Sequence, residues 1–442
     1  MKPPFTRNRP PSRERQVLLA LTLLFLASSP SRAQPSPPGQ IPPATSTANP
    51  VAVASNRFAV DLYRQLPVGE NLFFSPFSIV AALEMLELGA RGDTATELRQ
   101  ALYLKPPSEV EMTGEQGVAA LLKQLDGAGQ PYQLRVVDRI WPQSGYPFRA
   151  EFLKLLQTQF AATIEAQDFA RAPEAARGAI NHWVEVATEH KIKDLIPPGI
   201  LTPLTRMVLT NAIYFKGSWK SAFVPRATYA GPFHTPSGPR KVQFMRKEET
   251  FLYLHEGQVQ VLELPYLGDR LSMDIFLPDE QKGLPDLEKL MGATDPGSSS
   301  QRGTPGESLR RPPEGGTLEA WLSKLQPARV LMSIPRFKLT RSFSLGQTLQ
   351  RLGVVRAFSK SADFSGMDGK RDLVLAAVLH KAFVDVNEEG TEAAAATAVV
   401  VHLRSVSMEP EEMFVADHPF LFVIRDRVSG VFLFMGRVAA PE

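Results

Sequence analysis

The chain of 442 residues contains no cysteine. This absence excludes disulfide bonds, thiolate metal ligands, a cysteine nucleophile and a lipid-modified N-terminal cysteine. No asparagine stands in an Asn-x-Ser/Thr pattern, so we expect no N-glycosylation. Because 43% of the residues are hydrophobic, the chain can build a substantial core without covalent cross-links.

Signatures of common enzymes are also missing. The sequence has no Gly-x-Ser-x-Gly elbow and no His-Glu-x-x-His helix. Glu388 and Glu389 are adjacent and would point to opposite faces of a strand, which excludes a close acid–base pair. Arg91-Gly92-Asp93 is expected to form an ordinary turn rather than an adhesion motif. We therefore expect no enzyme activity, no catalytic residue, no cofactor and no metal.

Positive charge is concentrated in the first 33 residues. Basic residues there precede an apolar run, Val17–Ala27, and Ser31-Arg32-Ala33 offers a cleavage site. This order is typical of a signal peptide over residues 1–33, and the run is too short to span a membrane. The formal charge is +3 for the whole chain, and −2 without this segment. We therefore expect secretion, extracellular or periplasmic, and no binding to nucleic acid or membrane. An uncleaved anchor is the alternative.

Two other segments lack the periodicity of folded elements. Gln34–Pro50 is rich in Pro, Ser and Thr and predicts a disordered linker. Gly292–Gly316 is rich in Gly, Pro and Ser and predicts a low-complexity loop insertion. A folded domain is expected over residues 51–442.

Within that domain, helical and strand patterns alternate along the chain. Helices are predicted from near Val51, after a capping box at Thr94–Glu97, and over Ala175–Lys191. Strands are predicted at Val208–Phe215, Gln258–Pro265 and Leu271–Leu277. Helices in the first half and strands throughout the second half indicate an α+β fold.

The segment Glu388–Val401 has a composition suited to neither an ordinary loop nor an ordinary strand. Its charged start leads into four alanines, Ala393–Ala396, and then into valines. At period two, Thr391 and Ala393 begin one face, and Glu392 begins the other. Such a segment suits a chain that enters a sheet between close neighbours, because its side chains are small.

This segment and five ordered blocks resemble the serpins, the serine protease inhibitor family. The blocks are Asn71–Leu98, Val208–Phe223, Leu262–Pro278, Ala362–Met367 and His380–Val400, followed by a C-terminal signature at Phe414–Val438. The resemblance implies three β-sheets, about nine helices, an exposed reactive-centre loop and a native monomer. It implies inhibition of a serine protease by a covalent complex.

The resemblance also places the bond that a protease attacks. The family spacing from Gly390 puts Arg404 before this bond and Ser405 after it, and arginine suits trypsin-like proteases. His402, Leu403 or Met408 mark the bond if the loop register differs. The hinge and reactive loop cover residues 388–413, and the hinge comprises Glu388, Glu389, Gly390, Thr391, Ala393, Ala394, Ala395 and Ala396. Gly390 is expected to supply freedom at the pivot.

Other residues acquire mechanical roles by the same resemblance. A buried hydrogen-bonded group beneath the opening strands, the shutter, is expected at Ser75, Ser78, Asn211 and His380. The entry point of the loop, the breach, is expected at Trp219, Arg336 and Glu388, with Arg336 and Glu388 paired.

The sequence departs from the family pattern in places. Ala376 replaces a frequent serine and His190 replaces a frequent glycine. Lys123 is the only base between Glu109 and Gln130, so no heparin-type site is expected. A non-inhibitory serpin (carrier or chaperone) and a cross-class inhibitor of cysteine proteases remain as alternatives.

Overall fold

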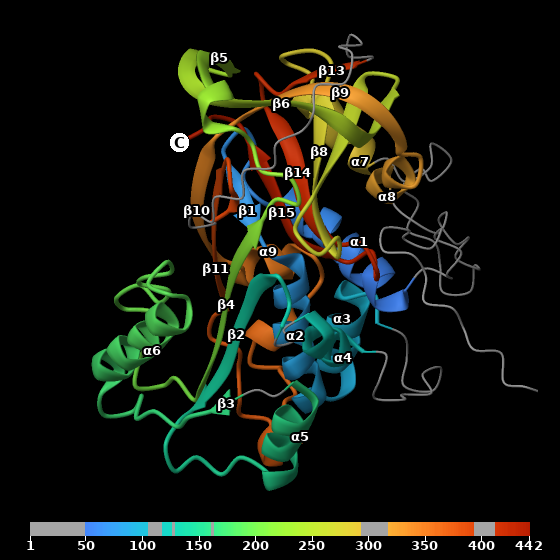
Figure 1. Cartoon of the computed structure of the whole chain (residues 1–442). Helices are drawn as coiled ribbons and strands as arrows, with labels where there is room; N and C mark the ends of the chain where they lie inside the picture. The colour runs from blue at the N-terminus through green and yellow to red at the C-terminus, as the bar shows by residue number, and fades with distance from the viewer. Residues whose placement is uncertain (1–48, 105–116, 126–128, 161–162, 293–316, 393–411) are drawn as a thin grey trace, which may run out of the picture. The chain divides into compact units, whose positions relative to one another are not determined.

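The computed structural model describes residues 49–104, 117–125, 129–160, 163–292, 317–392 and 412–442 (Figure 1). The predicted signal peptide and nearly all of the linker and loop insertion lie outside these residues, as do Ala393–Ala396, Arg404 and Ser405. None of the helices in the described ranges is long and apolar enough to cross a membrane.

A six-stranded sheet carries the hinge. Its strand order is β10 (Phe337–Ser344), β11 (Leu379–Asn387), β12 (Gly390–Thr391), β4 (Met207–Ser218), β2 (Tyr132–Pro142) and β3 (Thr163–Ile164). The predicted strand at Val208–Phe215 lies within β4, which is buried along nearly its whole length. A strand covered on both faces needs side chains that are apolar on both faces, which explains its unbroken hydrophobic run.

The second sheet has nine strands. Its order is β1 (Leu72–Phe74), β15 (Phe432–Val438), β14 (Phe420–Asp426), β8 (Leu271–Pro278), β7 (Val259–Pro265), β6 (Gly238–Glu256), β9 (Gln326–Pro335) and β13 (Glu412–Val415), with β5 (Tyr229–Thr235) paired to β6. The predicted strands at Gln258–Pro265 and Leu271–Leu277 are β7 and β8. The described strands thus form two hydrogen-bonded sheets rather than three, because the long β6 pairs in turn with β5, β9 and β7.

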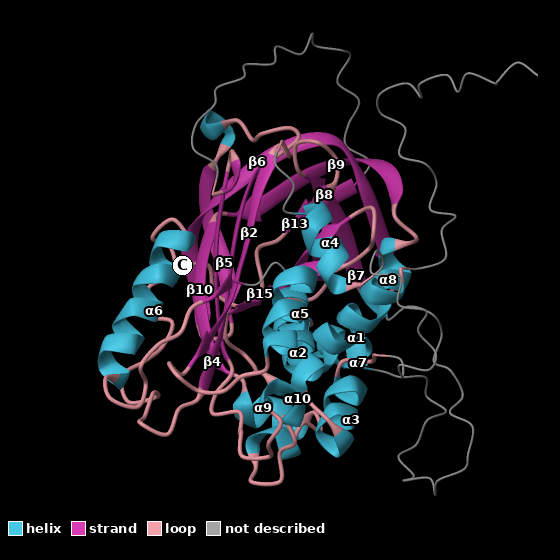
Figure 2. Cartoon of the chain, turned by 90° about the horizontal axis from the view of Figure 1, so that it is seen from below, coloured by secondary structure: helices cyan, strands magenta, loops and turns pink. Residues whose placement is uncertain are grey.

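Ten α-helices occur in the described part of the chain. They are α1 (Pro50–Gln65), α2 (Pro76–Gly89), α3 (Gly92–Ala101), α4 (Val118–Leu125), α5 (Ala150–Phe160), α6 (Pro173–Ala187), α7 (Leu284–Gly292), α8 (Thr317–Leu322), α9 (Gly346–Arg351) and α10 (Ser365–Asp368), with short 3₁₀ turns at Pro225–Ala227 and Arg356–Phe358. Figure 2 shows α6 on one side of the strands, whereas α1, α2, α5 and α9 lie on the other.

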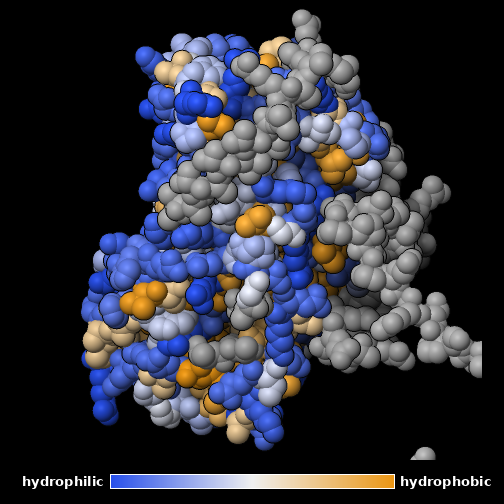
Figure 3. Space-filling model, viewed as in Figure 1, coloured by the Kyte–Doolittle hydropathy of each residue, from blue (hydrophilic) through white to orange (hydrophobic). Residues whose placement is uncertain are grey.

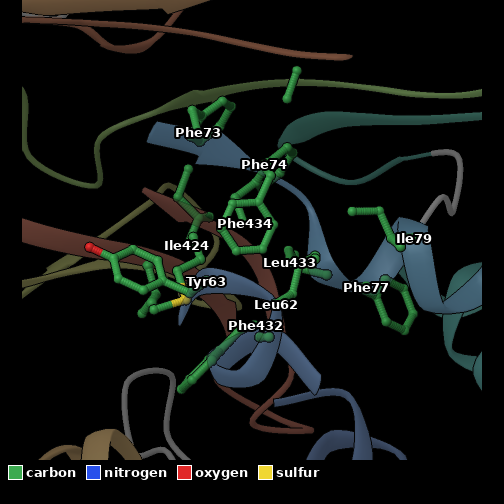
Figure 4. Packing of buried hydrophobic residues seen from close by; sticks show 14 of the residues in the cluster. Leu62, Tyr63, Phe73, Phe74, Phe77, Ile79, Ile424, Phe432, Leu433 and Phe434 are labelled. Atoms are coloured by element: carbon green, nitrogen blue, oxygen red, sulfur yellow. The ribbon is translucent and has the colours of Figure 1, made fainter. Parts of the chain in front are cut away.

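These two sides have separate cores. The larger core packs α1 and α2 against β1, β14 and β15, where Phe73 and Phe434 stack with ring centroids 5.2 Å apart (Figure 4). The smaller core lies between α6 and the hinge-bearing sheet and includes Ile180, Val184 and Phe383. Insertion of a strand into this sheet would therefore disturb packing on both faces.

Exposed hydrophobic residues of the described part of the chain are scattered over the surface. In Figure 3 polar residues cover most of the visible face, and hydrophobic residues appear in small separate groups. Strongly exposed apolar side chains such as Val68, Leu204 and Val428 come from different loops. Scattered residues of this kind are ordinary on a soluble surface.

Two local predictions need correction. The capping box is wrong, because α3 begins at Gly92 and Thr94 instead accepts a hydrogen bond from Asp363 N. α6 ends at Ala187 rather than Lys191, because the chain turns at Glu189 and His190, whose φ angles are 51° and 61°. His190 therefore occupies a left-handed position that glycine adopts without strain.

Candidate functional site

The hinge is a hairpin turn at one end of β11. β11 ends at Asn387, Glu388 and Glu389 form the two-residue turn, and β12 returns antiparallel from Gly390. The Asn387 side chain accepts a hydrogen bond of 3.0 Å from Glu389 N. The prediction that the two glutamates alternate along a strand is wrong, because the chain must reverse to enter the sheet beside β11.

Gly390 is required by close approach between backbones. A Cβ atom at this position would lie 2.0 Å from Gly217 O and 2.7 Å from Ser218 Cα. Real Cβ atoms do not approach so closely, so β12 can lie against β4 only with glycine here. Steric clearance therefore adds to the conformational freedom predicted for this residue.

Thr391 is already inside the sheet. It pairs with Val386 of β11 and with Gly217 of β4, and its side chain is fully buried. Its Oγ1 lies 2.7 Å from Tyr266 Oη, and burial raises the pKa of Tyr266, so the phenol stays protonated. The uncleaved chain therefore already seats Thr391 between two strands.

Trp219 holds the turn from the side of β4. Its Nε1 donates to Asn387 O at 2.9 Å, and its backbone N donates to Glu389 O at 2.9 Å. Its indole stacks on Tyr266 with centroids 4.6 Å apart. One aromatic residue thus fixes the carbonyl groups on both sides of Glu388.

Glu388 lies in a charged pair at the same end of the sheet. Its side chain is 7% exposed and accepts hydrogen bonds from Arg336 Nε at 2.9 Å and from Thr228 Oγ1. Burial alone would raise the pKa of this carboxyl, but the hydrogen bonds from Arg336 and Thr228 outweigh it and lower the pKa. The three predicted breach residues are therefore within one contact network.

Below the hinge, β11 and β4 pair directly. Four parallel pairs, from Leu379↔Thr210 to Ala382↔Ile213, form what we call the seam. Among the described residues, Phe383–Asp385 and Tyr214–Lys216 separate the seam from the hinge and are not paired with one another. Insertion beyond this unpaired stretch therefore requires the seam to open.

The four predicted shutter residues meet at this seam. His380 and Asn211 are Cα partners across it, and His380 Nδ1 lies 2.7 Å from Asn211 Oδ1. Ser75, which caps α2, donates from its backbone N to His380 Nε2 at 3.0 Å, and Ser78 Oγ donates to Asn211 Oδ1 at 2.9 Å. The network thus ties both strands to the start of α2.

Hydrogen bonding fixes the protonation state of His380. Its Nε2 accepts from a backbone N–H, so Nδ1 must carry the proton that it donates to Asn211. The ring is fully buried, and burial lowers the pKa of His380 to about 3. Asp138 accepts from Asn211 Nδ2 at 2.7 Å, and burial raises the pKa of this carboxyl to about 7.

Sequence reasoning missed several contacts of this site. Tyr266 belongs to a block that carried the family resemblance, but nothing in its spacing indicated contact with Thr391. Asp138 and Thr228 are isolated polar residues without a sequence signal. Lys191, in the segment after α6, contacts Glu392. The only sequence signal near it is the neighbouring His190, which replaces a frequent glycine of the family.

Comparison with known proteins identifies the family. A family model described as "Serpin (serine protease inhibitor)" matches residues 53–441. Leukocyte elastase inhibitor of Bos taurus is 42% identical over 405 residues, 88% of this chain and 99% of that protein. The chain belongs to the serpin family. The matched family is described as one of serine protease inhibitors rather than catalysts, and the bovine relative is itself named an inhibitor.

Two further matches support the family. Serpin B8 of Homo sapiens is 39% identical over 396 residues, 88% of this chain and 98% of that protein. The solved structure of uncleaved ovalbumin is 28% identical with a TM-score of 0.75, covering 88% of this chain and 100% of that one. The predicted α+β serpin fold is thereby confirmed.

The prediction of secretion is wrong. Leukocyte elastase inhibitor and Serpin B8 are intracellular serpins, which overturns the location inferred from the N-terminal segment. That inference depended on residues 1–33, which lie outside the described ranges. A short apolar run after basic residues is a compositional pattern, and composition alone does not determine the destination of a chain.

We predict that Arg336→Ala lowers the free energy of unfolding by up to about 3 kcal/mol at pH 7, because it leaves Glu388 buried without its cation. The pKa of Glu388 is lowered in the folded state, so the pair stabilises above the unfolded pKa of about 4.3 and loses this effect as pH falls through the folded pKa. Urea unfolding at pH 7 and below pH 4 measures the difference. Lys338→Ala is the control, since Lys338 is 58% exposed and pairs with Asp385 at 3.5 Å. Equal losses for both variants at pH 7 would contradict the prediction.

We predict that His380→Gln removes a pH-dependent part of the stability. The pKa of His380 is lowered to about 3, so an unfolded chain binds a proton here below about pH 6.5 while the folded chain does not. Relative to the variant, the wild type should therefore lose about 1.4 kcal/mol for each pH unit from 6.5 towards 4. Urea unfolding at several pH values tests this, with exposed His182→Gln as control. A wild-type curve parallel to that of His380→Gln would refute it.

Proposed function

We propose that this serpin is a suicide-substrate inhibitor of trypsin-like serine proteases that acts as a monomer. The observation that carries the proposal is the position of Gly390–Thr391. These residues already form a strand between β11 and β4 and head the small-residue segment Ala393–Ala396. A loop that has started to enter the sheet in the uncleaved protein is prepared to continue after cleavage.

Arg404 determines the target in this proposal. Its guanidinium would pair with the carboxylate in the specificity pocket of a trypsin-like protease. The protease serine Oγ attacks the Arg404 carbonyl carbon, the bond to Ser405 N breaks, and that nitrogen leaves as a protonated amine. The protease is then joined to the inhibitor through an ester.

Insertion competes with hydrolysis of this ester. Fourteen residue steps from Gly390 to Arg404 span about 46 Å as a strand, which carries the attached protease far along the molecule. Opening of the seam at His380 and Asn211 admits the strand, in accordance with the shutter role proposed for these residues. The driving force is the strain that a serpin stores in its uninserted loop and releases when the loop joins the sheet.

An elastase is a second candidate target. The bovine relative that is 42% identical is named a leukocyte elastase inhibitor. Elastases accept small apolar residues rather than arginine, so this candidate requires a different attacked bond from Arg404–Ser405. The alternatives at His402, Leu403 and Met408 would each shift the fragment that is released.

We predict a covalent one-to-one complex with trypsin that survives denaturing electrophoresis, and a released fragment whose sequence begins at Ser405. Arg404→Ala should abolish this complex without changing the urea midpoint, because the residue serves recognition. Leukocyte elastase is assayed in parallel with both proteins. A trypsin complex retained by Arg404→Ala, or a fragment that begins after Leu403 or Met408, would overturn the assigned bond.

We predict that Thr391→Arg converts the inhibitor into a substrate. The Thr391 side chain is fully buried against Tyr266, and a guanidinium there would lack a partner at a cost of several kcal/mol. The hinge would leave the sheet, insertion would slow, and trypsin would cleave the loop and depart active. The stoichiometry of inhibition is measured, with Thr391→Ser as control. A stoichiometry near one for Thr391→Arg would show that the seated hinge does not limit trapping.

A further inference from the structure

The segment after α6 lies across the two strands that must separate. From this segment, Glu189 accepts a hydrogen bond of 3.4 Å from Tyr214 Oη, and Tyr214 belongs to β4. Lys191 Nζ lies 5.6 Å from the ring centroid of Phe383, which belongs to β11. Both strand residues lie between the seam and the hinge. The segment therefore contacts the sheet on each side of the path that the loop would take.

The same segment also contacts the hinge. Lys191 forms an ion pair with Glu392, the residue that follows β12, and the Glu392 side chain is only 10% exposed. Burial raises the pKa of Tyr214, and the nearby carboxylates of Glu392 and Glu189 raise it further. Lys191 is thus the cation within a group of two carboxylates and one phenol.

Fixed packing holds this segment in place. Trp183 of α6 meets Trp141 of β2 edge to face at 5.4 Å, and the Arg139 guanidinium lies 3.9 Å from the Trp183 ring centroid. Thr188 is buried, donates to Val184 O at 2.8 Å and accepts from Ile192 N at 3.2 Å. The turn that carries Lys191 is therefore anchored at its start and at its end.

Backbone strain marks both sides of the ion pair. Glu189, His190 and Glu392 have φ angles of 51°, 61° and 52°, in the left-handed region that costs a side-chain-bearing residue about 1 kcal/mol or more. β12 ends at Thr391, so the strand stops directly before this conformation at Glu392. Continued insertion requires Glu392 to become extended, so whatever holds Glu392 also stops the loop.

We propose that Glu189, Lys191 and Tyr214 form a bracket that seats the hinge at Thr391 and checks further entry of the loop. Lys191 is a positioning residue in this bracket, because its ion pair holds Glu392 in the left-handed conformation between the hinge and the seam. The bracket must release Glu392, and the contacts with Phe383 and Tyr214 must part, before the next residue enters. This inference rests on the proposed trapping function.

The position of the hinge can be measured without a protease. In native-state hydrogen exchange of the full chain, the peptide that contains Thr391 and Glu392 reports whether β12 is seated, since Glu392 N donates to Asp385 O. Lys191→Met should speed exchange of this peptide about tenfold or more, because it leaves a buried carboxylate without its cation.

A charge swap separates the ion pair from simple packing. Lys191→Glu and Glu392→Lys should each unseat the hinge, and the double variant K191E/E392K should restore slow exchange. Lys193→Met is the matched control, because Lys193 lies in the same segment, is 63% exposed and pairs with Glu185 at 3.3 Å. Fast exchange that persists in the double variant, or equal acceleration by Lys193→Met, would overturn the bracket.

The second measurement is the stoichiometry of inhibition with trypsin. Lys191→Met should raise it to about two or more, because an unseated hinge must first re-enter the sheet before the released loop can follow. At least half of the acyl-enzyme then deacylates before insertion, and the double variant should return the stoichiometry towards the wild-type value. A normal stoichiometry in Lys191→Met with a fast-exchanging hinge would overturn the role of Lys191 in trapping. If the wild type forms no protease complex, the proposed function fails, whereas hydrogen exchange still decides whether the bracket exists.

Discussion

Direct pairing between β11 and β4 is the constraint on which this molecule depends. Four backbone pairs and the His380–Asn211 contact close the sheet at the seam, while β12 separates the same two strands at the hinge. The sheet is therefore complete at one end and expanded by one strand at the other. A residue that inserts beyond the unpaired stretch gains pairing on both sides but must first break pairing between β11 and β4, so a barrier lies at the boundary of the seam.

Opposing local forces determine where the inserted strand stops. Gly390 fits only because it lacks a side chain, and Thr391 gains a buried hydrogen bond with Tyr266. The next residue, Glu392, carries a charge and has a left-handed backbone. A buried carboxylate is stable only beside a cation, and Lys191 is fixed to the segment after α6. The register of the hinge is thus determined by Glu392, the first residue whose side chain cannot be buried without a cation beside it.

Much of the fold could be predicted from the sequence, because long apolar strands such as β4 and amphipathic helices such as α1 carry their own periodicity. The family pattern also located Ser75, Ser78, Asn211 and His380, which the structure brings together at the seam. What could not be predicted depends on tertiary contact. The turn at Glu388, the early burial of Thr391 and the pairing of Lys191 with Glu392 all require knowledge of which strands leave a gap, and no local pattern contains that information.

The sequence of the loop beyond Glu392 contains no second charged residue that would resist burial before Val401. From Ala393 to Val401 the sequence has no ionisable side chain, and the first four residues are alanine. Such residues need no partner when buried and pass between neighbouring strands with little steric resistance. Once Glu392 is released and the seam opens, no later residue in this run presents a comparable electrostatic cost. Resistance to insertion is therefore concentrated at Glu392 and at the seam, so that a small number of contacts controls a large movement.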